Sequence, residues 1–156
     1  MDIFDILKRE YAVISRYISE LEEMTYSVSV NTRDFSFLFR NLCRFWDQHE
    51  DKEEKLLRAL SEAGFKIPLE KIEFEHGELR RHRDTVILAI ESGDEDRIRR
   101  VLKKDCGEII DMLRAHTIAA ETLLADISPN DLSRETREKI ELLQIIPSDE
   151  IFEDKE

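Results

Sequence analysis

The sequence predicts an all-α protein: an up-down-up-down four-helix bundle followed by a short fifth helix. Only four glycines and three prolines occur among 156 residues, so the chain is rich in helix formers and poor in turns. Apolar residues recur at alternating spacings of three and four, which is the period of an amphipathic helix. Short connections separate the long periodic segments, and such connections make neighbouring helices antiparallel. The length suits one domain around a single core.

The first expected helix covers about residues 2–25 and the second about residues 33–62. The inner stripe of the first helix consists of Ile3, Leu7, Tyr11, Ile14, Ile18 and Leu21. The inner stripe of the second consists of Phe35, Leu38, Leu42, Phe45, His49, Glu53, Leu56 and Leu60. Gly64 follows as a terminator of the second helix. His49 and Glu53 therefore face the core, on a helix face that is otherwise apolar.

The third expected helix covers about residues 69–91 and the fourth about residues 95–127. Pro68 precedes the third helix and Gly93 follows it, as is typical of helix ends. The inner stripe of the third consists of Leu69, Ile72, His76, Leu79, Arg83, Val86 and Ile90. The inner stripe of the fourth consists of Leu102, Cys106, Ile109, Leu113, His116, Ala120 and Leu124. Each of these stripes carries one inward histidine.

The chain beyond the fourth helix divides into two parts. Residues 128–146 are expected to hold an additional helix that packs on the bundle, with an amphipathic stripe of Leu132, Thr136, Ile140 and Leu143. Residues 147–156 are expected to form an acidic tail. The bundle itself would then occupy residues 1–127.

Charge and composition exclude several classes of function. With 24 basic and 36 acidic residues the net charge is -12, which repels phosphate backbones, so no nucleic-acid partner is expected. No stretch approaches the roughly 20 apolar residues of a membrane span, and the first residues lack the features of a secretory signal. We therefore expect a cytoplasmic protein without a membrane partner. Cys43 and Cys106 lack CxxC spacing, so we expect two small buried residues rather than a disulfide or zinc ligands.

Counting residues from the connections places the inner polar residues near one level of the bundle. Tyr11 and His49 lie at similar distances from the first connection, at about 1.5 Å per residue. Glu53 and His76 lie at similar distances from the second. His116 fits less well, with an offset of roughly 10 Å from His76.

A buried layer of this kind needs compensation. A buried polar group without a partner costs about 1 to 3 kcal/mol, and an unpaired buried carboxylate costs several. A bound metal ion would compensate best, because imidazole nitrogen and carboxylate oxygen are metal donors. A donor set without thiolate suits non-haem iron, and suits manganese or zinc less decisively.

Several of these residues also have ordinary structural explanations. A glutamate four residues after a histidine is weak evidence alone, because 36 of the 156 residues are acidic. Residues 50–55 are interpreted as a solvated face with i, i+4 ion pairs, apart from Glu53 and with Glu50 and Glu54 left open. Structural roles, in the core or towards solvent, are assigned to Phe45, Trp46 and His82. Arg83 either pairs with a carboxylate beside the site or extends outward to solvent, and the second is preferred.

Three segments together resemble hemerythrin-like HHE cation-binding domains, over about residues 3–127. The segments are HEDKEE at 49–54, EFEHGEL at 73–79 and HTIAAETLL at 116–124. The resemblance implies a non-haem, usually di-iron site. It implies as metal ligands His49, Glu53, His76, His116 and Glu121. The last of these stands five residues after its histidine, a spacing that the hemerythrins also use.

The first helix departs from the family pattern. The family normally has Glu-His there, whereas this chain has Glu10 and Tyr11, so one histidine ligand is missing. Hemerythrins proper also carry a second histidine on the third helix, where this chain has Arg80, a cation that iron would repel. Four explanations stay open: Tyr11 ligates ferric iron as a phenolate, Glu10 or Glu50 adds an oxygen, one iron is lost, or the site is vestigial.

The resemblance implies a use in sensing or binding oxygen or nitric oxide, in redox stress response, or in iron handling.

A rival metal-binding fold is the ferritin-like di-iron bundle. It needs two ExxH pairs, and only Glu73 and His76 form one, so this fold is disfavoured. No catalytic residue is predicted, and whether the protein is an enzyme stays open. The competing hypothesis is a degenerate, metal-free bundle that acts as an interaction or regulatory module. A protein partner or a homo-oligomer is compatible with both hypotheses.

Overall fold

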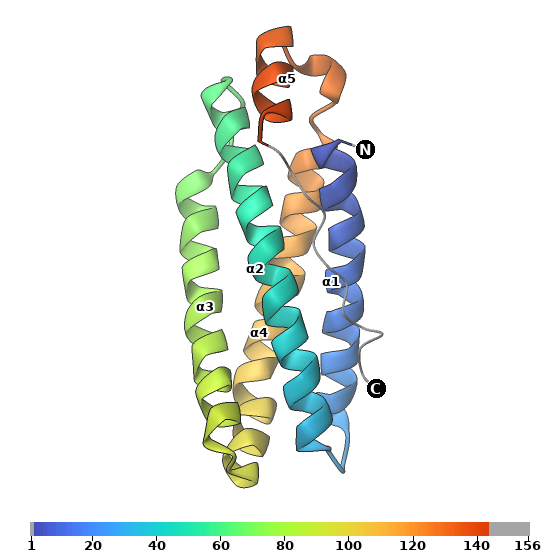
Figure 1. Cartoon of the computed structure of the whole chain (residues 1–156), viewed down its shortest axis with the longest axis vertical. Coiled ribbons are helices and arrows are strands. Elements are labelled where there is room, and N and C mark those ends of the chain that lie inside the picture. Colours follow the sequence, from blue (N-terminus) through green and yellow to red (C-terminus); the bar gives the residue numbers. More distant parts are fainter. Residues whose placement is uncertain (1, 144–156) are drawn as a thin grey trace.

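The computed structural model describes residues 2–143 and shows four long helices standing side by side (Figure 1). They are α1 (Ile3–Tyr26), α2 (Thr32–Glu62), α3 (Leu69–Ser92) and α4 (Glu95–Ala125). A 3-10 turn, η1 (Pro129–Asp131), leads to the short helix α5 (Arg134–Glu141). All of these elements in the described part of the chain are helical. The predicted all-α, up-down-up-down bundle with a short fifth helix is therefore confirmed.

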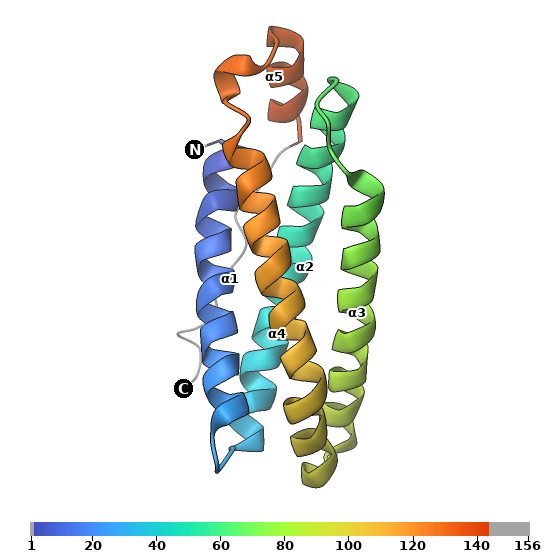
Figure 2. The same ribbon diagram turned by 180° about the vertical axis from the view of Figure 1, so that it is seen from behind.

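The long helices are arranged so that α1 and α3 each pack against both α2 and α4. The views from opposite sides place α5 at the end of the bundle where α1 begins (Figures 1 and 2). There α5 contacts α2, and Lys139 of α5 forms an ion pair with Glu62 at the end of α2. The acidic tail expected at residues 147–156 lies outside the described residues.

The helix ends follow local chemistry. Asp2, Asn31 and Asp94 each precede a long helix, and their side chains accept hydrogen bonds from backbone N–H groups of its first turn. Helix α3 instead ends at Gly93, whose φ of 69° lies in the left-handed region that glycine adopts without steric cost. Gly93 and Asp94 alone reverse the chain between α3 and α4.

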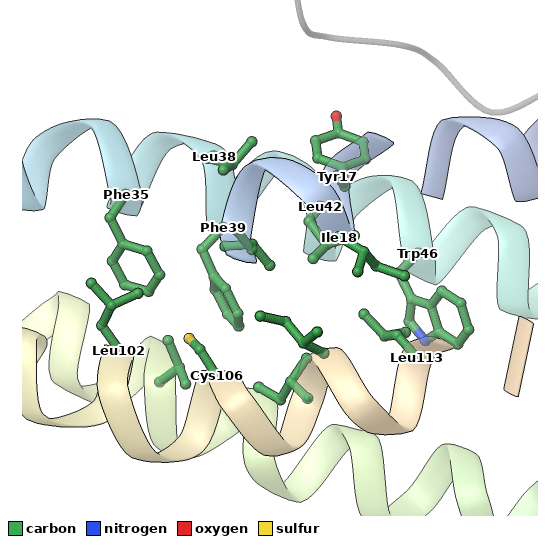
Figure 3. Packing of buried hydrophobic residues seen from close by; sticks show 14 of the residues in the cluster. Tyr17, Ile18, Phe35, Leu38, Phe39, Leu42, Trp46, Leu102, Cys106 and Leu113 are labelled. Carbon is green, nitrogen blue, oxygen red and sulfur yellow. The ribbon is translucent and has the colours of Figure 1, made fainter. Parts of the chain in front are cut away.

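The buried apolar residues form two clusters, one towards each end of the bundle. The first contains Phe35, Phe39, Leu102 and Cys106, which pack against one another between α2 and α4 (Figure 3). The second contains buried side chains of all four long helices together with Ile140 of α5. Buried polar residues of the middle turns lie between the two clusters, and they form the candidate site.

Burial agrees with most of the predicted stripes. Every residue predicted to face inward on α1, α2 and α4 is buried. On α3 the exceptions are Leu69 and Arg83, which are both half-buried, and the guanidinium of Arg83 turns outward to Asp47. Cys106 is buried as expected, whereas Cys43 is only half-buried, and burial raises the pKa of its thiol to about 12. Among the described helices, none is long and apolar enough to cross a membrane.

Candidate metal centre

Glu53 of α2 is fully buried and stands at the centre of the polar layer. Its Oε1 atom lies 2.8 Å from Nε2 of His116 and 3.4 Å from Nε2 of His76. The two Nε2 atoms are themselves 3.3 Å apart. Imidazoles from α3 and α4 therefore point their inner nitrogens at each other and at one carboxylate oxygen.

The second oxygen of Glu53 faces α1 and the preceding turn of α2. Oε2 accepts a hydrogen bond of 2.8 Å from the hydroxyl of Tyr11. It also lies 3.2 Å from Nε2 of His49, one turn earlier on α2. One carboxylate thus joins two sets of donors, one on each of its oxygens.

His76 and His116 meet despite the offset of roughly 10 Å expected from residue counting. Helix α4 begins regularly at Glu95, so the start of the helix does not absorb the difference. The reason lies in side-chain direction, because every Cα–Cβ bond tilts towards the N-terminus of its own helix. His76 is nearer than His116 to the turn between α3 and α4, and its side chain tilts away from that turn. The side chain of His116, which is farther away, tilts towards the turn. The two rings converge.

The outer nitrogens of two histidines also face carboxylates. Nδ1 of His49 lies 2.9 Å from Oε1 of Glu10, and Lys52 donates to the other oxygen of Glu10. Nδ1 of His76 lies 2.8 Å from Oε1 of Glu54. Hydrogen bonds of this kind fix the orientation and tautomer of an imidazole.

Two assignments from the sequence need correction. Lys52 was expected on a solvated face, but it is only 5% exposed, because its ammonium group pairs with buried Glu10. Arg80 was expected to place a positive charge against the metal ion, which would repel it. Its guanidinium is instead directed at Glu50 and is half exposed. Both cations are held by carboxylates behind the histidines. Sequence reasoning missed Lys52, although its position three residues after His49 places it on the same side of α2.

Trp46 is buried, as predicted, and packs against the site. Its ring centroid lies 5.4 Å from that of His49, 6.0 Å from His76 and 5.6 Å from His116. Its indole N–H donates a hydrogen bond of 2.7 Å to Glu50. The indole thus walls the site on the side of the first apolar cluster and excludes water there.

Burial and hydrogen bonding perturb the acidities within the site. Burial alone would raise the pKa of Glu53, but hydrogen bonds from His116, His49 and His76 hold this pKa well below its usual value. Burial alone would lower the pKa of His49, yet its hydrogen bonds with Glu10 and Glu53 raise it. His76 behaves in the same way through Glu53 and Glu54. Burial, followed by the charge of Glu53, raises the pKa of Tyr11.

Glu121 lies apart from the buried cluster. It is exposed, and it lines a surface groove of about 430 Å³ between α1 and α4 that Tyr11 also lines. A second groove, of about 400 Å³ between α3 and α4, reaches His116. Of the six sequence-predicted residues, the structure brings together His49, Glu53, His76, His116 and Tyr11, and places Glu121 at the solvent side of Tyr11.

The donor set suits a metal ion. Ligand atoms of Glu53, His76 and His116 lie within 4.8 Å of one another, and all three residues are buried. Two imidazole nitrogens 3.3 Å apart beside a carboxylate oxygen can share one cation. A second group, Glu50, Glu54 and His76, has similar spacing, but Arg80 already pairs with its first two members.

Fold and site together define a class: a helical bundle with a buried histidine–carboxylate centre of the kind that holds a cation between its helices. Comparison with protein families gives the family itself. The family model described as Hemerythrin HHE cation binding domain matches residues 2–127. The chain therefore belongs to this family, and the suspected resemblance is confirmed. Comparisons with curated proteins and with solved structures each gave no match.

Proposed function

We propose that this protein binds non-haem iron in the centre of its bundle. The proposed ligands are His49, Glu53, His76, His116, Glu121 and Tyr11. The observation that carries the proposal is the convergence of three imidazole Nε2 atoms, from three helices, on the two oxygens of Glu53. Membership of a cation-binding family supports the same conclusion.

We propose further that the centre is dinuclear, in which case the two oxygens of Glu53, each with its own set of neighbouring donors, would help to hold the ions. On Oε1 the available donors are His76 and His116, and on Oε2 they are His49 and Tyr11. Glu121 lies near Tyr11, whose pKa its charge helps to raise, so it is available on the Oε2 side. The spare carboxylate and phenol oxygens on that side support a site with more oxygen donors than a reversible oxygen carrier has.

The use that we propose is the sensing or binding of oxygen or nitric oxide, redox stress response, or iron handling. Bound iron would supply the affinity for a diatomic molecule. The chain supplies access and shielding: two surface grooves reach Tyr11 and His116, while Trp46 closes another side of the site.

A second candidate function is a metal-free interaction or regulatory module. One observation favours it: the histidines and carboxylates of the site form hydrogen bonds with one another and with Lys52 and Arg80. A fully connected polar network of this kind can be stable without a metal ion.

Metal analysis decides between the two. We expect the protein, purified without chelator or reconstituted with Fe(II) under anaerobic conditions, to hold one or two equivalents of iron. His49→Ala should lose most of it, because both the ring nitrogen near Glu53 and the anchor of Glu10 disappear. His82→Ala is the matched control, since His82 pairs with Asp105 and Glu108 outside the site. Wild-type protein that takes up no iron would leave only the metal-free module.

A further inference from the structure

A buried ion pair stands directly behind His49. Glu10 of α1 is 4% exposed and Lys52 of α2 is 5% exposed, so both charges have left water. Such a pair is costly unless its geometry and hydrogen bonds are good. Here one oxygen of Glu10 lies 2.9 Å from Nδ1 of His49 and the other accepts from the ammonium group of Lys52. Both oxygens of Glu10 therefore have a partner.

This arrangement determines which nitrogen of His49 is available. An Nδ1–H that donates to Glu10 leaves Nε2 as the nitrogen with a lone pair. Nε2 is the atom that faces Glu53, at 3.2 Å. Glu10 lies on the opposite side of the imidazole ring from Glu53, so it approaches the ring rather than the centre of the site.

We propose that Glu10 is a positioning residue for His49 and that Lys52 holds it in this role, so that neither residue ligates the metal. The inference rests on the proposed metal site and names two residues that act on it from outside. Glu10 fixes the ring and its tautomer by accepting from Nδ1–H. Lys52 neutralises the carboxylate, so the pair adds no net charge beside the cation.

Two double variants isolate the hydrogen-bond acceptor from the charge. E10Q/K52M and E10A/K52M each remove one negative and one positive buried charge, and only the first keeps an oxygen that can accept from His49. Asp51→Asn with Lys55→Met is the matched control, since this i, i+4 ion pair lies exposed on the same helix. Circular dichroism and melting temperature establish that each full-length variant is folded before metal is added.

The affinity for Co(II), measured by competition with a chromophoric chelator, is the first readout. We expect E10Q/K52M and the control to bind within about threefold of wild type. We expect E10A/K52M to bind about 10- to 100-fold more weakly, as is usual when the partner of a ligating histidine is removed. If Glu10 itself ligated the metal, both variants would lose this ligand and would bind Co(II) equally weakly. A difference between them of less than about threefold therefore overturns the proposal.

The second readout is specific to the ring of His49. In the proton NMR spectrum of the Co(II) protein in water, N–H protons of ligated imidazoles are shifted and exchange with solvent. We expect E10Q/K52M to keep the same set of these signals as wild type, and E10A/K52M to lose one through faster exchange. An unchanged set in E10A/K52M contradicts the proposal. Failure of wild type itself to bind Co(II) would instead count against the metal site.

Discussion

Tyr11 of α1 belongs to the site in the structure. It is 2% exposed, and its hydroxyl donates to the carboxylate that His49, His76 and His116 also approach. In the metal-free protein it keeps its proton, because burial and the nearby negative charge of Glu53 raise its pKa. A ferric ion at Oε2 of Glu53 would reverse this preference, since a cation stabilises the phenolate.

Tyr11→Phe tests whether this phenolate forms. We expect the ferric protein to show a visible phenolate-to-iron charge-transfer band that is absent from the variant. The variant should also unfold about 1 kcal/mol more easily, since Glu53 loses a buried hydrogen bond. Absorption spectra and urea titrations measure the two effects. Tyr17→Phe, which alters a buried tyrosine of the same helix outside the site, should keep the band. Identical spectra for wild type and Tyr11→Phe would exclude ligation by Tyr11.

At the residue scale, periodicity predicted which side chains face inward but not how they pair. The inward positions of His49, Glu53, His76 and His116 follow from spacings of three and four, and all four are buried. The burial of Lys52 could not be predicted in this way, because it depends on Glu10, 42 residues away on another helix. Pairings between distant helices leave no mark in local periodicity.

The turn between α3 and α4 determines how these two helices present their histidines. Only Gly93 and Asp94 separate the helices, and the left-handed conformation of Gly93 lets Asp94 begin α4 at once. Helix ends were predicted well here, because glycine and aspartate signal a stop and a start locally. The meeting of His76 and His116 was not predicted, because residue counting ignores the direction in which side chains lean.

Two glycine substitutions should change stability in opposite directions. Gly93→Ala should lower the free energy of unfolding by about 1 kcal/mol, because alanine is disfavoured at positive φ. Gly107→Ala should raise it by about 0.5 to 1 kcal/mol, since Gly107 lies within α4 and a Cβ there meets no atom within 4 Å. Chemical denaturation of both variants measures this. Shifts of the same sign would show that backbone conformation does not control stability at these positions.

On the scale of the whole molecule, a charged layer divides the core into two apolar clusters. In the metal-free protein, protonated His49 and His76 stabilise this layer by pairing with carboxylates, which is why their pKa values are raised. This contribution is fully present below the unfolded pKa of about 6.5 and is lost as pH rises through the higher folded values. A metal ion needs the same imidazoles unprotonated, so protons and metal compete for the site.

The competition predicts how metal stabilisation depends on pH. We expect the rise in melting temperature on adding a fixed, saturating concentration of Zn(II) to be larger at pH 8 than at pH 6. Tighter binding at the higher pH shifts the folding equilibrium further. Differential scanning calorimetry with and without a chelator measures the rise, and His49→Ala serves as the control that should show little response. A rise that is equal at the two pH values, or smaller at pH 8, would contradict the competition.

Trp46 is the single tryptophan of the chain, and its indole touches three imidazoles of the site. All intrinsic tryptophan fluorescence of the protein therefore originates beside the proposed iron ligands. A paramagnetic ion a few ångströms away quenches an excited indole, so emission intensity should report occupancy directly. The fluorescence of Trp46 can therefore be used to follow binding or loss of the ion in real time, without any added label.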